Sequence, residues 1–168
     1  MKKINNKKGF TFVEMLVCVI TLLMVGAICA TGTGISVKSY QQSRFETDSQ
    51  MLESTLDMAL GDLLRFASDI NADGNNVRFT NRYYQMEQGI VNVDENGHFM
   101  ISKNPQHTNQ TFALIGDKAY AGDLRITDFT LSYNEGTKLF TGGYTIESKA
   151  MPSDPGKACT FTYRTIAE

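Results

Sequence analysis

The chain has 168 residues, enough for one globular domain and one further element. It carries 16 Lys and Arg against 18 Asp and Glu, a formal net charge of −2. Four of the lysines precede a long apolar run, which leaves 12 basic and 18 acidic residues, a net charge of −6, for the rest. An acidic body excludes broad electrostatic binding to nucleic acid or anionic lipid, so no intrinsic nucleic-acid binding is expected.

The apolar run covers residues 10–30, and Lys2, Lys3, Lys7 and Lys8 stand before it. As a helix it would measure roughly 30 Å, enough to cross a bilayer. The preceding lysines predict a cytoplasmic N-terminus, with everything after the run outside the membrane. A secretory signal peptide, a lipoprotein signal with Cys29 and a plain signal anchor are the alternatives. Residues 27–30 fit a small-x-small cleavage site poorly, and Ile28 is bulky for a lipoprotein site.

Glu14 lies inside this apolar run, where an ionised carboxylate costs several kcal/mol unless it is paired. Gly9 and Phe10 stand at the border between the basic leader and the run, where a membrane peptidase can reach the chain. Cleavage between them would free an amine on Phe10. That amine, from a neighbouring subunit, is a natural partner for Glu14 in an apolar filament core.

The segment from Lys7 to Leu16, KKGFTFVEML, resembles the leader and processing motif of type IV prepilins and type II secretion pseudopilins. The resemblance implies cleavage between Gly9 and Phe10 by prepilin peptidase, N-methylation of Phe10 and a role for Glu14 in filament assembly. It also implies that the partners are other pilin or pseudopilin subunits and the inner assembly platform. The sequence differs from those of many pilins in two features. Its N-terminal helix lacks a proline, and its C-terminal region lacks a cysteine pair.

Residues 31–34, Thr-Gly-Thr-Gly, interrupt the apolar run and weaken a helix there by about 2–3 kcal/mol relative to alanine. They are predicted to act either as a hinge or as a site of close helix–helix approach. Beyond them apolar residues recur at spacings of three, four or seven, which predicts an amphipathic helix. One helix from about residue 10 to residue 68 is therefore expected, with an apolar stripe made of Phe45, Leu52, Leu56, Ala59, Leu63, Phe66 and Ile70.

Residues 69–76, rich in Asp, Asn and Gly, are predicted to end the helix in a turn. Residues 94–97 and 134–137 are each flanked by alternating apolar runs, which predicts two β-hairpins. Residues 111–115 and 159–166 read as further strands. A helix followed by an antiparallel meander predicts an α+β, pilin-like fold with the helix packed on one sheet face. The expected organisation is a leader (1–9), a transmembrane or filament-core segment (10–35) and an extracytoplasmic globular domain (36–168).

No catalytic constellation stands out, so the chain is expected to be non-enzymatic. His98 and His107 fall in turn-rich stretches and are expected at the surface. Two aromatic and two basic residues could touch nucleic acid or another surface, although a solvated strand face is the simpler interpretation: Arg78, Arg82, Tyr83 and Tyr84.

Asp69, Asn71 and Asp73 with the following glycine resemble the first half of a calcium-binding loop. The second half departs from it, because Thr80 stands where a bidentate glutamate is expected. A plain turn is the alternative, and no other cofactor is expected.

The sequence thus favours a structural subunit of a type IV pilus, competence or type II secretion-like filament, located in the membrane and at the cell surface. The alternative is a membrane-anchored extracellular sensor or ligand-binding domain that does not assemble. Major pilin, minor pilin and pseudopilin are not distinguished.

Overall fold

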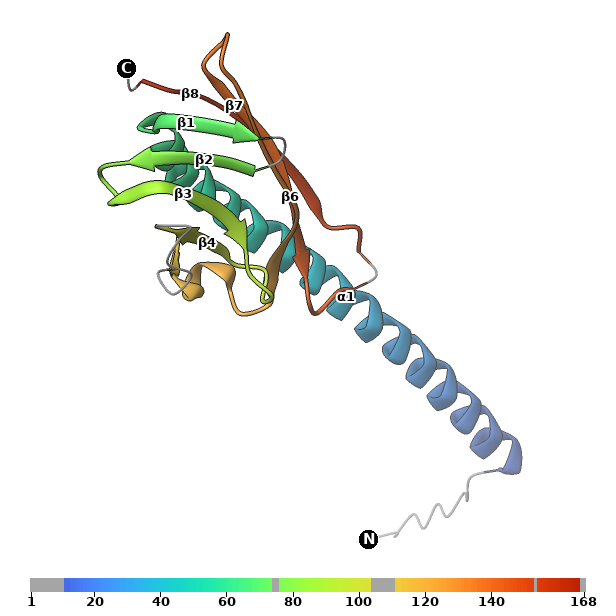
Figure 1. The fold of residues 1–168 in the computed structure, drawn as a ribbon. Coiled ribbons are helices and arrows are strands. Elements are labelled where there is room, and N and C mark those ends of the chain that lie inside the picture. The colour runs from blue at the N-terminus through green and yellow to red at the C-terminus, as the bar shows by residue number, and fades with distance from the viewer. Residues whose placement is uncertain (1–10, 74–75, 104–110, 153, 167–168) are drawn as a thin grey trace, which may run out of the picture. The chain divides into compact units, whose positions relative to one another are not determined.

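A computed structural model describes residues 11–73, 76–103, 111–152 and 154–166. The chain divides into two compact units, residues 1–44 and residues 45–168. The described part of the first unit consists of Thr11 and the first turns of helix α1 (Phe12–Arg65). The second unit contains the rest of α1 and all the strands (Figure 1).

Helix α1 is continuous for 54 residues and passes through residues 31–34 without a break. The hydroxyl groups in this part bond to carbonyls one turn earlier, since Thr31 donates to the Ala27 and Ile28 carbonyls and Thr33 to that of Ala30. Hydroxyls satisfied within the helix can enter an apolar environment at little cost. By length and composition the helix is sufficient to cross a membrane.

The helix ends at Arg65, three residues earlier than predicted. Its last carbonyls find partners outside the helix: that of Leu63 accepts from the Asn81 side-chain amide at 2.8 Å, and that of Arg65 from Ile166 N at 2.8 Å. A helix end leaves such carbonyls without intrahelical partners, so these bonds fix where α1 stops. Consequently Phe66 is exposed and Ile70 belongs to a strand, although both were predicted in the helical stripe.

The strands form two antiparallel sheets, whereas a single sheet was expected. The five-stranded sheet has the order β1 (Ser68–Asp73), β2 (Asn76–Asn81), β3 (Met86–Val93), β4 (Phe99–Ser102), β5 (Thr111–Ala113). After the short 3-10 helix η1 (Asp117–Tyr120), the three-stranded sheet follows with β6 (Leu124–Asn134), β7 (Leu139–Ser148) and β8 (Lys157–Arg164). The coarse α+β layout, one long helix followed by antiparallel strands, is confirmed.

Both predicted hairpins are present. Strands β3 and β4 pair with Val93 opposite Phe99, and β6 and β7 with Asn134 opposite Leu139. The predicted turn at residues 69–76 is wrong for most of its length, because residues up to Asp73 form β1 and pair with β2. This polar edge strand lacks the apolar alternation by which strands are recognised in a sequence.

The core of the second unit joins the C-terminal half of α1 to both sheets. Leu52, Leu56 and Leu63 are buried as predicted, and Leu60 and Leu64 join them. They share one apolar cluster with aromatic residues from the strands: Phe79, Phe99, Phe140, Tyr144, Phe161 and Tyr163. Burial of a leucine contributes about 1.5–3 kcal/mol, so this stripe is the main attachment of the helix to the strands.

Candidate functional site

The predicted processing residues Gly9 and Phe10 lie outside the described residues, and the described site begins at Thr11. Thr11 and Glu14 form a reciprocal pair at the start of α1. The Glu14 carboxylate accepts from Thr11 N at 2.8 Å and from the Thr11 hydroxyl at 2.9 Å, and Glu14 N donates to that hydroxyl at 3.4 Å. This is the geometry of a capping box, which satisfies donors that a helix N-terminus otherwise leaves unpaired.

The capping box gives Glu14 a role within its own chain. The spacing T-x-x-E is typical of a capping box. The prediction that Glu14 pairs with another subunit did not include this role. Both bonds from Thr11 end on one oxygen, Oε2, and a carboxylate has about four lone-pair sites. The side chain can therefore hold its helix start and still accept a cation.

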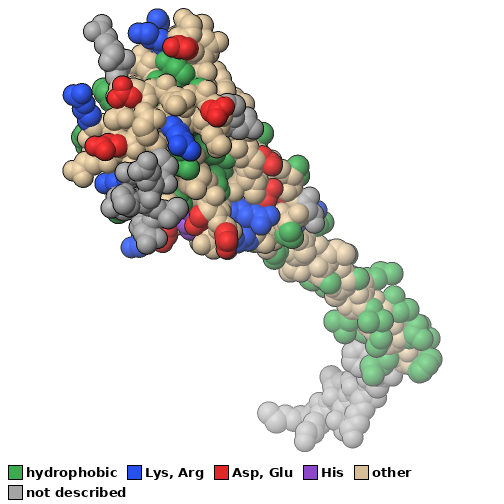
Figure 2. Space-filling view, viewed as in Figure 1, with side chains coloured by type: hydrophobic (Ala, Val, Ile, Leu, Met, Phe, Trp, Pro, Cys, Tyr) green, Lys and Arg blue, Asp and Glu red, His purple; other side chains and the backbone are tan. Residues whose placement is uncertain are grey.

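The surface of α1 between residues 12 and 30 is largely apolar, and it becomes mostly polar from there to the end of the first unit at residue 44. From Phe12 to Val37 large hydrophobic side chains are exposed, including Leu22, Leu23 and Ile28. Figure 2 shows apolar side chains gathered on the N-terminal part of this helix, while charged side chains gather on the β-containing unit. Monomeric soluble proteins rarely expose so large an apolar patch, so this surface requires lipid or other chains to cover it.

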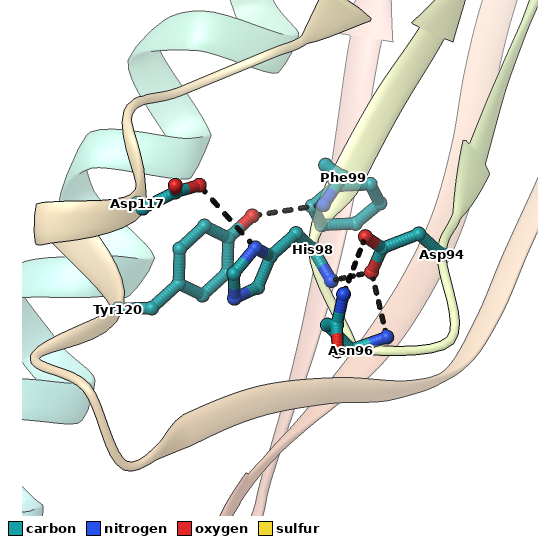
Figure 3. Close-up of polar contacts among 6 residues, drawn as sticks. All are labelled: Asp94, Asn96, His98, Phe99, Asp117 and Tyr120. Atoms are coloured by element: carbon teal, nitrogen blue, oxygen red, sulfur yellow. Dashed lines mark hydrogen bonds and ion pairs between the residues drawn. The ribbon is translucent and has the colours of Figure 1, made fainter. Parts of the chain in front are cut away.

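A second cluster of chemistry-bearing residues surrounds His98 at the β3–β4 turn (Figure 3). The His98 ring stacks on that of Tyr120 with 4.1 Å between centroids, and its Nδ1 lies 3.5 Å from an Asp117 carboxylate oxygen. His98 lies at a turn, as predicted, and its side chain is half-buried, with 21% of it exposed. His107 lies outside the described residues.

Hydrogen bonds around His98 stabilise the β3–β4 turn and connect the start of β4 to η1. The Tyr120 hydroxyl accepts from Phe99 N at 2.8 Å, and burial raises the pKa of Tyr120 to about 12. Burial also raises the pKa of Asp94, but bonds from His98 N and Asn96 outweigh it and leave that pKa below its ordinary value. The bonds to Asp94 close the β3–β4 turn, and the contacts of His98 and Phe99 with Asp117 and Tyr120 join that turn to η1. We therefore interpret the cluster as structural.

The calcium candidates do not form the loop that such a site requires. Asp69, Asn71 and Asp73 lie on strand β1, all exposed. In a strand, alternate side chains are spread along one face, whereas a calcium loop wraps its ligands around one point. Within the described ranges there is no group of three or more His, Cys, Asp or Glu side chains placed to share a metal ion.

Polar pairs join α1 to strand β8. The Tyr163 hydroxyl donates to the Asp57 carboxylate and backbone carbonyl, and the Lys157 ammonium pairs with Glu53. Between these pairs Cys159 is buried, and that burial raises the pKa of its thiol to about 11, so it stays protonated and unreactive at neutral pH.

Comparison of the chain with protein-family models, with curated proteins and with solved structures gave no match.

Proposed function

We propose that the protein is a non-enzymatic structural subunit of a type IV pilus, competence or secretion-like filament. The observation that carries the proposal is that the two parts of one continuous helix differ in what their side chains contact. Its first part begins beside the Gly9–Phe10 motif and exposes large apolar side chains between Phe12 and Val37. Its second part contributes buried leucines to the core of the second unit. A subunit that packs its helix among neighbouring subunits needs both an exposed apolar helix surface and a second helix part that is anchored in a folded unit.

In this proposal prepilin peptidase cuts after Gly9 and the new N-terminus at Phe10 is methylated. Before assembly the helix crosses the membrane with its N-terminus in the cytoplasm and the second unit outside. The Glu14 carboxylate, held by Thr11, then accepts the Phe10 amine of a neighbouring subunit, because an apolar environment strongly favours pairing of the two charges. Other subunits and the assembly platform are the partners.

The proposal is tested by placing the same bulky side chain at two glycines. Gly9→Leu should leave the leader attached when the chain is expressed with a prepilin peptidase. Gly26→Leu is the control, because a side chain at Gly26 meets nothing within 4 Å and adds apolar surface to an apolar run. The intact mass of each membrane-extracted protein is measured. A mature mass for Gly9→Leu, or full-length wild-type protein, contradicts the proposal.

The alternative function is a membrane-anchored domain that binds a ligand without assembling. It is favoured by a surface recess on the second unit, lined by Tyr83, Lys103 and Phe112 among others. The two functions differ in the fate of the N-terminus, since a simple anchor needs no cleavage at Gly9.

A further inference from the structure

A recess of about 400 Å³ opens on the second unit where three segments meet. They are the turn between β2 and β3, the end of β4 with Lys103, and β5. In the β4–β5 pair Ile101 stands opposite Phe112, so the two side chains share a face of the sheet. Ile101 is buried and Phe112 is 50% exposed, so the core-facing side of the sheet becomes accessible at this point.

The recess has a rigid support in Asn81, whose side chain is fully buried. Its amide nitrogen donates to the Leu63 carbonyl at the end of α1. Its amide oxygen accepts from Tyr83 N at 2.9 Å and Tyr84 N at 3.2 Å. One buried side chain thus ties the turn carrying both tyrosines to the helix end, and such support is typical of preorganised binding sites.

Aromatic side chains form two walls of the recess. Tyr83 is 86% exposed and packs edge-on against Tyr84 with 5.3 Å between ring centroids. Phe112 stands on the opposite segment. Exposed ring faces are unfavourable in water, and a ligand with a flat apolar face covers them favourably.

Lys103 selects the charge of the ligand. Its ammonium lies 4.7 Å from the centre of the Phe112 ring, and among the described residues that line the recess it is the only Lys, Arg, Asp or Glu side-chain group. No Asp or Glu of the described residues forms an ion pair with it. Lys103 as a residue is half-buried, and an ammonium group that is not paired with a carboxylate favours an anionic ligand.

We propose that the recess binds an acidic sugar residue, a pyranose ring bearing a carboxylate or phosphate group. The C–H face of the ring stacks on Tyr83 and Phe112, the anionic group meets Lys103, and the tyrosine hydroxyls and the Gln85 amide are available to sugar hydroxyls. Nucleic acid fits less well, because it requires a track of cations and the body carries net negative charge. This inference does not depend on filament assembly.

The test uses the full chain in zwitterionic detergent micelles, with binding followed by saturation-transfer NMR and calorimetry. The probes are trigalacturonate with its methyl ester as the uncharged control, and glucose 6-phosphate with glucose as control. We expect at least one acidic probe to bind about tenfold more tightly than its control. Lys103→Met should remove that preference and Tyr83→Ala should weaken binding about fivefold or more. Lys149→Met, an exposed lysine outside the recess, should change nothing.

The proposal is overturned if neither acidic probe binds saturably, or if the uncharged controls bind equally well. Retention of the preference in Lys103→Met also overturns it. Tighter binding of a thymidine oligonucleotide or of triglutamate to the same residues would assign the recess to nucleic acid or acidic peptide instead. Circular dichroism of each variant verifies the fold, and Tyr83 is exposed enough for its loss to leave the core intact.

Discussion

Glu14 has two roles open to it at the start of α1, and they need different chemistry. The capping role needs an oxygen that accepts from Thr11 N, which an amide supplies as well as a carboxylate. Pairing with the amine of a neighbouring subunit needs the negative charge. A substitution that keeps the side-chain oxygen and removes the negative charge therefore distinguishes the capping role from the pairing role.

We therefore predict that Glu14→Gln inserts in the membrane and is cleaved normally but enters filaments as poorly as Glu14→Ala. Thr11→Ala, which removes the capping hydroxyl, should cost about 1 kcal/mol of helix stability and assemble better than either. Sheared filament and membrane fractions are compared by immunoblot. Normal assembly of Glu14→Gln together with failure of Thr11→Ala would show that Glu14 acts only as a cap.

Buried tyrosines predict a loss of stability at high pH. Burial raises the pKa of Tyr120 to about 12, and burial also raises the pKa values of Tyr144 and Tyr163, the latter with help from its bond to Asp57. Above pH 10 these side chains lose protons in the unfolded chain and keep them in the folded one. The free energy of unfolding is therefore intact below pH 10 and falls above it, by up to about 1.4 kcal/mol per pH unit for each tyrosine.

Urea unfolding of the full chain in micelles at pH 8, 10 and 11 measures this fall. Tyr120→Phe is the matched variant. It should be less stable at pH 8, because Phe99 N loses its acceptor, but its stability should decrease less between pH 10 and 11. An equal decrease in both proteins would show that Tyr120 does not contribute.

At the scale of elements, the second half of α1 has one buried face and one exposed face. An aspartate on the buried face should destabilise the fold, whereas an aspartate on the exposed face should not. Leu63 is fully buried and Met58, five residues earlier, is 66% exposed. Leu63→Asp places an unpaired charge in the core, which costs several kcal/mol against a typical total stability of 5–15 kcal/mol. We predict that Leu63→Asp loses resistance to limited proteolysis while Met58→Asp keeps it. A resistant Leu63→Asp protein would mean that this face is not buried.

The glycines at residues 32 and 34 are predicted to be free of steric constraint in the single chain. A Cβ at either position meets nothing within 4 Å, and alanine favours helix over glycine by about 1 kcal/mol. The double alanine variant should therefore keep or raise the helix content of the isolated subunit, measured by circular dichroism. A decrease would mean that α1 is not regular there.

Filament assembly then distinguishes the two predicted roles of residues 31–34. A hinge is impaired by the stiffening double alanine variant. Close helix–helix approach is already impaired by Gly34→Ser alone, and an unbroken helix through these residues in an assembled filament would exclude the hinge.

The elements that could be predicted from the sequence carry local signals. Both hairpins were predicted from turn residues between alternating apolar runs, and the buried face of the helix was predicted from the spacing of its leucines. Strand β1 was missed because its residues are polar and it is stabilised by pairing with β2. The end of α1 was misplaced because it depends on Asn81 and Ile166, which are distant in the sequence. The division into two sheets and the recess beside Tyr83 likewise depend on which strands meet.

At the scale of the whole molecule, one chain combines a helix that needs an apolar covering with a unit that has its own core. In the proposed function, assembly depends on cleavage at the border between the lysine-rich N-terminal segment and that helix. Cleavage frees the amine that Glu14 is proposed to bind. The alternative anchor would carry the same helix with an unprocessed N-terminus.

The chain's own N-terminus is therefore the most direct test. Protein extracted from membranes of cells that contain a prepilin peptidase is examined by N-terminal sequencing and intact mass. The proposed function predicts a chain that starts at N-methylated Phe10. A chain that starts at Met1 and still carries residues 1–9 would contradict it.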